Sequence, residues 1–342
     1  MAVRIGINGF GRIGRQVTKV ICERYPDQIE LVAVNDLTDD QSLAHLLKYD
    51  SIYGRFPGAV EARDGQIIIN GKPVKSLELR DPAQLPWQDL GVDIVLESTG
   101  LFTDPAKASA HLQAGARKVI VSAPCKGSAE NMVTVVLGVN DDMYDPARHN
   151  IVSNASCTTN CLAPLTKVLH DFAGIECGVM NTIHSYTNDQ RILDLPHSDR
   201  RRMRAAALNM IPTSTGAAKA IGLVIPELKG KLDGLSVRVP TPTGSVVDLT
   251  AKVRNPGKCT VEAINAAYQA AATEGPLAPY MDYNDDEIVL SDIVGCPASC
   301  TYDAGTTYIA GDLVKVLGWY DNEWGFSNRV ADLIVLMAAK GL

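Results

Sequence analysis

The amino-acid sequence predicts an α/β protein: a doubly wound parallel sheet, followed by an α+β part with a mainly antiparallel sheet. Two observations predict this fold class. An apolar strand, a glycine-rich turn and a helical pattern follow one another at the start of the chain, and long alternating strands appear after about residue 151. The 342 residues suffice for two hydrophobic cores. We expect one domain over residues 1–152, a second over 153–321, and a C-terminal helix within 322–342 that packs back on the first domain.

Composition and charge exclude several classes of protein. Hydrophobic residues make up 46% of the chain and charged residues 21%, as in ordinary globular domains. The net charge of −7 argues against a nucleic-acid or membrane-surface binder, and no apolar run reaches the ~20 residues of a membrane span. The eight cysteines are too dilute for a disulfide scaffold, and Val3 already begins a strand, so we expect no export signal. We therefore expect a cytoplasmic protein with no metal site and no nucleic-acid or membrane partner.

The first strand and the turn after it point to a nucleotide. Val3–Asn8 leads into Gly9-Phe10-Gly11-Arg12-Ile13-Gly14, and a helical pattern continues from there. A second strand over Ile29–Val34 ends just before Asp36, which lies 22 positions after Gly14. A glycine-rich turn alone could be an ordinary tight βα turn, but this spacing between strand, glycines and acid is that of a Rossmann-type dinucleotide-binding domain.

Asp36 also favours NAD over NADP. A carboxylate here can accept from the ribose hydroxyls, but it would repel a 2′-phosphate, and no basic residue follows within Leu37–Asp40. Further strands are predicted over Val92–Glu97 and Lys118–Ser122. Because ligands lie at the carboxyl ends of such strands, we expect six residues beside NAD. These are Gly9, Gly11, Gly14, Asp36, Thr99 and Ser122.

The second half has the pattern of an antiparallel sheet with helices. Alternating strands are predicted over Cys177–His184, Leu232–Pro240, Ser245–Val253 and Leu313–Tyr320. Helices are predicted over Thr158–Phe172, Gly216–Val224, Val261–Thr273 and Ser327–Ala339.

Cys157 and His184 are the candidate catalytic pair. Cys157 lies in a run of hydroxyl and amide residues where a helix is predicted to begin, and helix N-termini favour the thiolate. We therefore expect the pKa of Cys157 to be lowered. His184, 27 residues further on, ends a predicted strand and is a suitable base or cation for a thiol. A single histidine can also be structural, but a donor-rich cysteine and a cofactor domain in the same chain favour catalysis.

The chain resembles the phosphorylating, NAD-dependent glyceraldehyde-3-phosphate dehydrogenases from Val3 to its last helix. The likeness rests on five segments in the same order: Gly9–Gly14, Ala155–Cys161, His184–Gln190, Pro212–Ala220 and Trp319–Gly325. The resemblance implies that Cys157 forms a hemithioacetal with glyceraldehyde 3-phosphate and that His184 takes its proton as hydride passes to NAD. Inorganic phosphate then cleaves the resulting thioester to 1,3-bisphosphoglycerate, a step of glycolysis and gluconeogenesis.

The resemblance also implies the binding residues and the assembly. Those around the substrate phosphate are Thr187, Asp189, Arg238 and Arg204, and those around inorganic phosphate are Ser156, Thr158, Thr215 and Gly216. For NAD it adds Arg12 and Ile13 at the pyrophosphate, Arg80 near the adenine, and Asn322 beside the nicotinamide carboxamide. Leu195-Pro196 matches the form that prefers NAD, and the basic stretch from Arg200 to Arg204 would lie on a loop at a subunit interface of a homotetramer.

Some residues depart from the family pattern. Phe326 stands where a tyrosine is common, and Cys125-Lys126-Gly127 replaces a serine–lysine–aspartate sequence. Cys296 and Cys300 are additional cysteines, for which we expect small core positions rather than a metal or redox pair. Two other functions stay open: an erythrose-4-phosphate dehydrogenase, and a non-catalytic NAD- or RNA-binding protein on the same scaffold.

Overall fold

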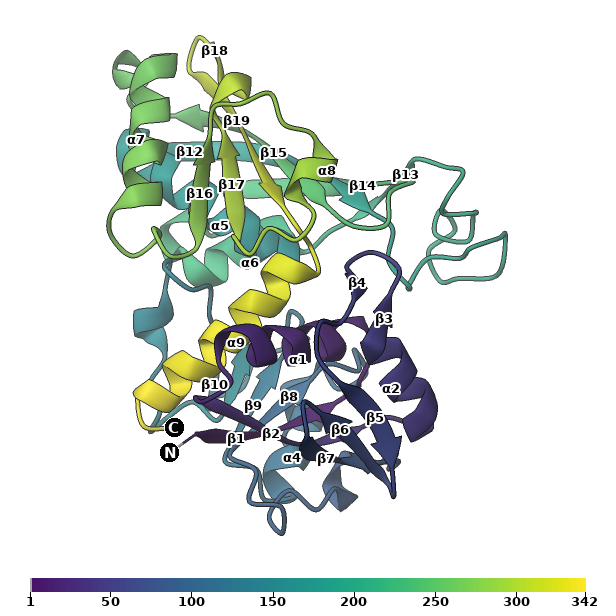
Figure 1. Cartoon of the computed structure of the whole chain (residues 1–342). Coiled ribbons are helices and arrows are strands. Elements are labelled where there is room, and N and C mark those ends of the chain that lie inside the picture. The colour runs from purple at the N-terminus through teal and green to yellow at the C-terminus, as the bar shows by residue number, and fades with distance from the viewer. Residues whose placement is uncertain (1) are drawn as a thin grey trace. The chain divides into compact units, whose positions relative to one another are not determined.

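The computed structural model describes residues 2–342, which form two compact units (Figure 1). The first unit contains the chain up to Val135, residues 142–155 and residues 327–342, and the second contains residues 136–141 and 156–326. The sequence placed the divisions before residues 153 and 322, whereas the contacts place them after Ala155 and after Phe326. The chain thus passes between the units four times.

The first unit is built on a nine-stranded sheet with the strand order β10-β11-β9-β8-β1-β2-β7-β6-β5. Its strands are β1 (Val3–Asn8), β2 (Ile29–Asn35), β5 (Val60–Arg63), β6 (Gln66–Ile69), β7 (Lys72–Leu77), β8 (Ile94–Glu97), β9 (Lys118–Val121), β10 (Met132–Thr134) and β11 (Ile151–Ser153). Its helices include α1 (Arg12–Arg24), α2 (Asp40–Lys48), α3 (Pro105–Ala108) and α4 (Ala110–Gln113), and β3 (Tyr49–Asp50) pairs with β4 (Gly54–Arg55) in a small separate sheet.

Apolar strands form the centre of this sheet. From β10 to β7 all neighbouring strands are parallel, and only β6 and β5 add an antiparallel edge. Ile5, Ile7, Ile94 and Val95 have no exposed surface, as expected of a parallel sheet whose two faces are both covered. The predicted doubly wound parallel sheet is confirmed.

The last helix, α9 (Trp324–Ala339), packs in the first unit from Ser327 on. Val330, Ile334 and Met337 are fully buried. Tyr25 of the loop after α1 donates to Asp332, and Arg24 lies 3.4 Å from the same carboxylate.

A buried carboxylate ties α1 to the loop after α2. Asp50 accepts from Arg12 Nη1 at 2.9 Å, from Lys19 Nζ at 3.3 Å and from Gln16 Nε2 at 2.7 Å. Burial by itself raises the pKa of Asp50, but the N–H groups of Ile52 and Tyr53 and the charges of Arg12 and Lys19 outweigh it and hold that pKa far below its usual range. The Asp50 carboxylate is therefore ionised throughout the physiological range.

Asp50→Asn should destabilise the protein by about 3–5 kcal/mol at pH 7, because it removes the carboxylate that the buried Lys19 and the partly buried Arg12 share. The lowered pKa means that this stabilisation is complete above the unfolded-state pKa of about 3.9 and is lost as pH falls below it. Urea denaturation should thus show a large difference in the free energy of unfolding between variant and wild type at pH 7, and a smaller difference at pH 3. Asp64→Asn is the matched control, since the Arg63–Asp64 pair is exposed and should contribute little; equal effects of the two variants would contradict this role.

The second unit contains an eight-stranded sheet whose main path has the order β13-β14-β12-β15-β19-β17-β16, with β18 pairing to β19. Its strands are β12 (Ile175–Ser185), β13 (Ile211–Ser214), β14 (Leu232–Val239), β15 (Ser245–Val253), β16 (Met281–Asn284), β17 (Cys300–Asp303), β18 (Tyr308–Ala310) and β19 (Leu313–Tyr320). Its helices are α5 (Cys157–Ala173), α6 (Ala217–Val224), α7 (Val261–Thr273) and α8 (Leu290–Ile293).

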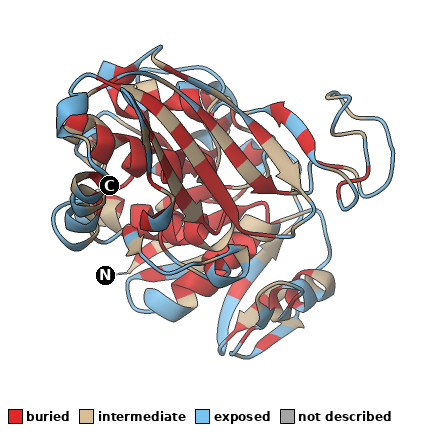
Figure 2. Ribbon diagram, turned by 90° about the horizontal axis from the view of Figure 1, so that it is seen from above, coloured by how far each residue is buried: buried red, intermediate tan, exposed pale blue. Residues whose placement is uncertain are grey.

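Most strand pairs of this sheet are antiparallel, as predicted, and only β12–β14 and β16–β17 are parallel. Figure 2 shows buried positions alternating with half-buried ones along the long strands. Helix α5 packs on this sheet, and Cys161 on it is fully buried with its Sγ 3.4 Å from the Gly318 carbonyl. Cys161 therefore faces the core. Among the described residues, no helix has both the length and the apolar character needed to cross a bilayer.

Candidate active site

Cys157 is the first residue of α5, and local backbone geometry places it there. Ser156 caps the helix, accepting from the Thr159 N–H at 3.0 Å. The residue before it, Ala155, is fully buried with φ of 55°, a left-handed conformation that costs an alanine roughly 1–2 kcal/mol. This turn between β11 and α5 puts the cysteine side chain at the positive end of the helix.

The His184 side chain lies against the cysteine sulfur. The distance from Cys157 Sγ to His184 Nε2 is 3.5 Å, and His184 Nδ1 lies 2.7 Å from the Ser185 carbonyl oxygen. Since a carbonyl only accepts, Nδ1 carries the proton and donates it, which leaves Nε2 with a free lone pair toward the thiol. The sequence-predicted pair is thus brought together with the imidazole oriented as a base.

The structure corrects the expected protonation of this pair. Burial raises the pKa of Cys157, and the opposing effects of Arg238 and of the Thr158 hydroxyl and N–H do not overcome it. Burial, together with the Arg238 charge, lowers the pKa of His184 to about 3. The expected thiolate at neutral pH is therefore wrong for this structure, which favours a neutral thiol beside a neutral imidazole. The helix N-terminus was visible in the sequence, but the degree of burial was not.

The buried Tyr320 side chain connects the elements that carry Cys157 and His184. Its hydroxyl is 2.9 Å from both Thr158 Oγ1 on α5 and Thr182 Oγ1 on β12, and its ring meets the His184 ring edge-on with centroids 6.0 Å apart. Strand β12, which carries His184, and helix α5, which carries Cys157, are therefore tied to the same buried side chain.

Donor groups beside the pair form a candidate anion site. Arg238 Nη1 donates to the Ser185 carbonyl and to Thr187 Oγ1, each at 3.2 Å. Its Nε, and the Nε2 of Gln190 on the other side of Thr187, are buried without a hydrogen-bond partner in the described part of the chain. Buried donors without partners are costly, so this arrangement indicates a negatively charged ligand. Gln190 ends the segment His184–Gln190 on which the resemblance rests, but it was not predicted as a site residue, because a glutamine side chain carries no charge.

The arginines of the following loop differ from the expectation. Arg204, expected at the substrate phosphate, is largely exposed and donates to Asp194 at 2.8 Å. Arg202 instead donates to Asp189 and to Thr213 Oγ1, and its charge helps to lower the pKa of His184 and of Arg238. Asp189 is therefore an ion-pair partner that orients Arg202. Arg202 differs from the neighbouring arginines only in how it packs in the folded loop, and the sequence does not reveal this packing.

The residues predicted around a second anion lie near the starts of α5 and α6. Thr158 is buried in the first turn of α5, and the Ser156 hydroxyl is engaged as the helix cap. Thr215 and Gly216 precede α6, which packs on α5, and Thr215 Oγ1 accepts from the Ala217 N–H at 3.2 Å. Nothing lies within 4 Å of a Cβ built on Gly216, so the start of α6 is open to a ligand.

The glycine-rich turn of the first unit has the geometry that a dinucleotide requires. Gly9 has φ of 94°, and a Cβ there would lie 2.6 Å from the Thr99 N. A Cβ on Gly14 would lie 2.4 Å from the Gly9 carbonyl oxygen, so this glycine lets α1 pack on the turn, whereas the space beside Gly11 is open. The first glycine makes the turn, the second leaves room for a pyrophosphate, and the third allows close packing.

A pocket of about 330 Å³ lies at this turn, and its lining fits NAD. It is lined by Asn8, Gly9, Gly11, Asn35, Asp36, Leu37, Leu79, Arg80, Ser98, Thr99, Leu101 and Phe102. The N–H groups of Phe10 and Thr38 donate to Asp36 at 2.9 and 3.2 Å, which holds the carboxylate in place. Apolar walls and one carboxylate match an adenosine with a free 2′-hydroxyl.

Other predicted cofactor residues have different partners. Arg12 donates to Asp50, as described above, and Ser122 donates to the Glu97 carbonyl at 3.1 Å. Ile13 lies in the first turn of α1, where its N–H rather than its side chain would face a pyrophosphate.

A buried polar network supports the floor of this pocket. The Glu97 carboxylate, 2% exposed, accepts from Asn8 Nδ2 at 2.6 Å and from the Thr99 N–H at 2.8 Å. Trp87 donates to His111 Nδ1, so His111 Nε2 carries the proton and donates to Glu97 at 3.0 Å. Asn8, Thr99 and His111 thus all donate to one carboxylate, which fixes the ends of β1 and β8 where the pocket opens. This network was not predicted from the sequence, because its members are scattered along the chain.

The remaining predicted cofactor residue, Asn322, follows β19 in the second unit. Its Oδ1 accepts from Ser245 Oγ at 3.2 Å, and the side chain is buried apart from a small exposed part.

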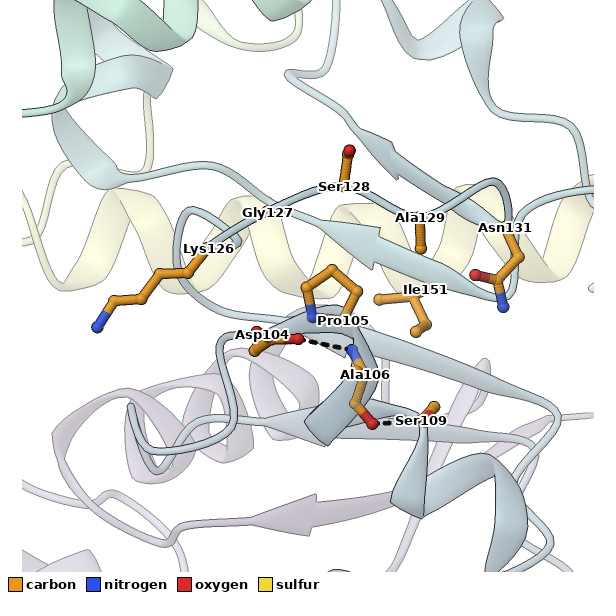
Figure 3. Close-up of a pocket in the computed structure, with 10 residues that line it drawn as sticks. All are labelled: Asp104, Pro105, Ala106, Ser109, Lys126, Gly127, Ser128, Ala129, Asn131 and Ile151. Atoms are coloured by element: carbon orange, nitrogen blue, oxygen red, sulfur yellow. Dashed lines mark hydrogen bonds between the residues drawn. The ribbon is translucent and has the colours of Figure 1, made fainter.

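The other cysteines and a second pocket offer no chemistry. Cys300 is buried as expected, whereas Cys296 is partly exposed with Sγ 3.6 Å from Asp282. Burial raises the pKa of Cys125 to about 11. A hollow of about 300 Å³ is lined by Asp104, Pro105, Ala106, Ser109, Lys126, Gly127, Ser128, Ala129, Asn131 and Ile151, and Figure 3 shows the Lys126 side chain extending away from it. Its Asp104 caps α3 through the Ala106 N–H, so that carboxylate already has a structural role.

The chain matches two protein-family models. Residues 3–105 match the NAD binding domain of glyceraldehyde 3-phosphate dehydrogenase, and residues 156–322 match its C-terminal domain. The chain is 58% identical over 339 residues to glyceraldehyde-3-phosphate dehydrogenase 2 of Streptomyces arenae, with 99% of each chain covered. It is 59% identical over 342 residues to the glyceraldehyde-3-phosphate dehydrogenase of Mycobacterium avium, covering 98% of this chain and 99% of that one. Since these matches extend over both units, the chain belongs to the glyceraldehyde 3-phosphate dehydrogenase family.

Proposed function

We propose that the protein oxidises D-glyceraldehyde 3-phosphate with NAD and inorganic phosphate to 1,3-bisphosphoglycerate, in glycolysis or gluconeogenesis. The observation that carries this proposal is the 3.5 Å distance between Cys157 Sγ and the unprotonated Nε2 of His184 at the start of α5. A thiol with a base is the arrangement that covalent aldehyde oxidation needs.

In this mechanism His184 Nε2 takes the thiol proton as Cys157 Sγ adds to the aldehyde carbon, and it then passes this proton to the former carbonyl oxygen, which gives a hemithioacetal. Nδ1 donates to the Ser185 carbonyl throughout, which holds the ring as the proton arrives. His184 then takes the hemithioacetal hydroxyl proton as the carbon loses hydride, which leaves a thioester on Cys157. NAD, when bound, supplies the hydride acceptor that this oxidation requires. Phosphate attack on the thioester carbon releases the acyl phosphate and the Cys157 sulfur.

Two groups of residues are proposed to bind the two phosphates. Arg238, Thr187, Gln190 and Arg202 would hold the substrate phosphate, supported by the unpaired donors of Arg238 and Gln190. Ser156, Thr158, Thr215 and Gly216 would hold the attacking phosphate at the starts of α5 and α6.

For NAD we propose the turn from Gly9 to Gly14 at the pyrophosphate, Asp36 at the adenosine ribose, and Arg80 and Thr99 in the adenosine pocket. Asn322 would contact the nicotinamide carboxamide. The carbon skeleton of the aldehyde is proposed to be the three-carbon sugar, since the segments around Thr187 and Thr215 match that enzyme better than its four-carbon relative.

The test is phosphate-dependent NADH formation from glyceraldehyde 3-phosphate, followed at 340 nm beside iodoacetate-treated protein. We expect activity that requires phosphate and is abolished by the alkylation. A kcat/KM at least tenfold higher with erythrose 4-phosphate would assign the alternative substrate, and NAD binding without any turnover would indicate a binding protein.

Asp36 should control the choice of cofactor. Asp36→Gly, combined with Leu195→Ala and Pro196→Ser, is expected to raise the ratio of kcat/KM for NADP to that for NAD by tenfold or more. The reason is that the variant removes the carboxylate that repels a 2′-phosphate. Steady-state kinetics with both cofactors checks this, with Asp39→Asn as a control because Asp39 caps α2 nearby. An unchanged ratio would refute the role of Asp36.

We further propose a cytoplasmic homotetramer. The loop between β12 and β13, which Figure 1 shows extending from the second unit, exposes five large apolar side chains: Ile192 (84%), Leu193 (72%), Leu195 (58%), Leu208 (78%) and Met210 (75%). Apolar side chains gathered on one loop favour burial against another subunit. Light scattering on the purified protein would give four times the mass of the chain, and a monomer at micromolar concentration would contradict the proposal.

A further inference from the structure

We infer that Ser245 is a positioning residue that sets the orientation of the Asn322 amide toward the nicotinamide carboxamide. The inference rests on the proposed function, and deepens it, because Ser245 belongs to no predicted set and touches no reacting atom. It follows from the direction of a short hydrogen-bond chain inside the second unit.

The direction of this chain is fixed by its first donor. The Ser185 N–H donates to Ser245 Oγ at 3.3 Å, so it occupies a lone pair of that oxygen. The Ser245 hydroxyl proton is then available for the remaining neighbour, Asn322, whose amide lies 3.2 Å away. Because a hydroxyl that donates must meet an acceptor, Asn322 presents Oδ1 to Ser245.

The consequence for the Asn322 amide is an outward-facing NH₂ group. Its Nδ2 donates to no group in residues 2–342, yet only 6% of the residue is exposed. A donor held in this way suits a carbonyl oxygen of a ligand, and the carbonyl of the nicotinamide carboxamide is such an acceptor. With Ser245 absent, the amide could turn over and present Oδ1 instead, which would repel that carbonyl.

The position of Ser245 in the sheet explains why it can do this. It begins β15, opposite His184 of β12 on one side and Tyr320 of β19 on the other. Asn322 follows Tyr320 by two residues, and Ser185 follows His184. Ser245, which is 1% exposed, therefore joins the segment that holds the base to the segment proposed to hold the cofactor amide.

The experiment measures binding by calorimetry of the full-length protein with NAD and with ADP-ribose, which lacks the nicotinamide. Ser245→Ala should weaken NAD binding by about threefold to tenfold, the effect of one hydrogen bond, and leave ADP-ribose binding unchanged. Ser245→Thr, which keeps a hydroxyl, should restore most of the NAD affinity. Ser236→Ala is the matched control, because this serine is equally buried in the same sheet but its Oγ has no partner within the described residues.

A double variant separates Ser245 from the other residues of the site. In the Asn322→Ala background, Ser245→Ala should cause no further loss of NAD affinity, since the two residues act in series. The rate of Cys157 alkylation without NAD should stay within twofold of the wild type.

Three outcomes would overturn the inference. Equal losses of affinity for NAD and for ADP-ribose in Ser245→Ala would indicate a merely structural serine. Additive losses of NAD affinity in the double variant would show that Ser245 acts independently of Asn322. Slowed Cys157 alkylation with unchanged NAD affinity would show that Ser245 acts on His184 instead. Failure of the wild type to bind NAD at all would overturn the proposed function, which is a distinguishable result.

Discussion

Cys157→Ser should abolish phosphate-dependent NADH formation, with kcat reduced by at least about 10³-fold. A serine hydroxyl is a far weaker nucleophile than a thiol, and its proton is much harder to remove. The variant should nevertheless bind NAD with wild-type affinity, because Cys157 lies outside the adenosine pocket. Steady-state kinetics and calorimetry together check this result.

Cys177→Ser is the matched control for the cysteine substitution. Cys177 is an exposed free thiol on β12, so the same chemical change there should leave kcat unchanged. Iodoacetate followed by mass spectrometry should inactivate the wild type in step with the labelling of Cys157. Full inactivation with Cys157 unlabelled would reject this residue as the nucleophile.

His184→Asn should lower kcat by about 10²- to 10⁴-fold at neutral pH, the range usually attributed to a general base. The raised pKa of Cys157 makes the thiol the predominant form at neutral pH, so attack depends on a group that removes its proton. The wild-type imidazole is unprotonated above about pH 4, since the pKa of His184 is about 3. Because the pKa of Cys157 is raised, the rate of Cys157 alkylation should rise with pH through the alkaline range.

The His184→Asn variant and the wild type should also differ in how the rate of Cys157 alkylation depends on pH. As pH approaches the pKa of Cys157, solvent hydroxide ionises the thiol without help, and the gap between the alkylation rates of His184→Asn and wild type should narrow. His45→Asn serves as the control, because His45 is an exposed histidine on α2 in the first unit. A constant ratio of rates between pH 7 and 10 would contradict the role of His184 as a base toward the thiol.

Regular elements could be predicted from the sequence because their pattern is local. Strands β1, β15 and β19 and helix α7 have the predicted bounds, and the predicted second strand ends one residue short of Asn35. Helix α5 begins at Cys157, one residue before the predicted start at Thr158, and ends at Ala173, one residue after the predicted end at Phe172. The pairing of Cys157 with His184 came from chemistry, since no periodicity places residues 27 positions apart together.

Properties that depend on packing could not be predicted. The burial that raises the pKa of Cys157 comes from strands far away in sequence, so the thiolate expectation failed. Arg204 and Arg202 stand in one basic run, and only the folded loop shows that Arg204 pairs with Asp194 while Arg202 reaches Asp189. The attachment of Arg12 to Asp50, 38 positions away, was invisible for the same reason.

Because the chain passes between the units four times, neither half of the sequence contains a complete unit. A gene fragment ending at Ala155 would lack the helix that covers part of its core, so Val330, Ile334 and Met337 would leave an apolar surface open to solvent. Recombination with a relative that exchanged only the amino-terminal segment would therefore pair one parent's core with the other parent's last helix. Viable chimeras should be those that exchange residues 327–342 together with the first 155, which makes the two ends of the gene evolve as a linked pair.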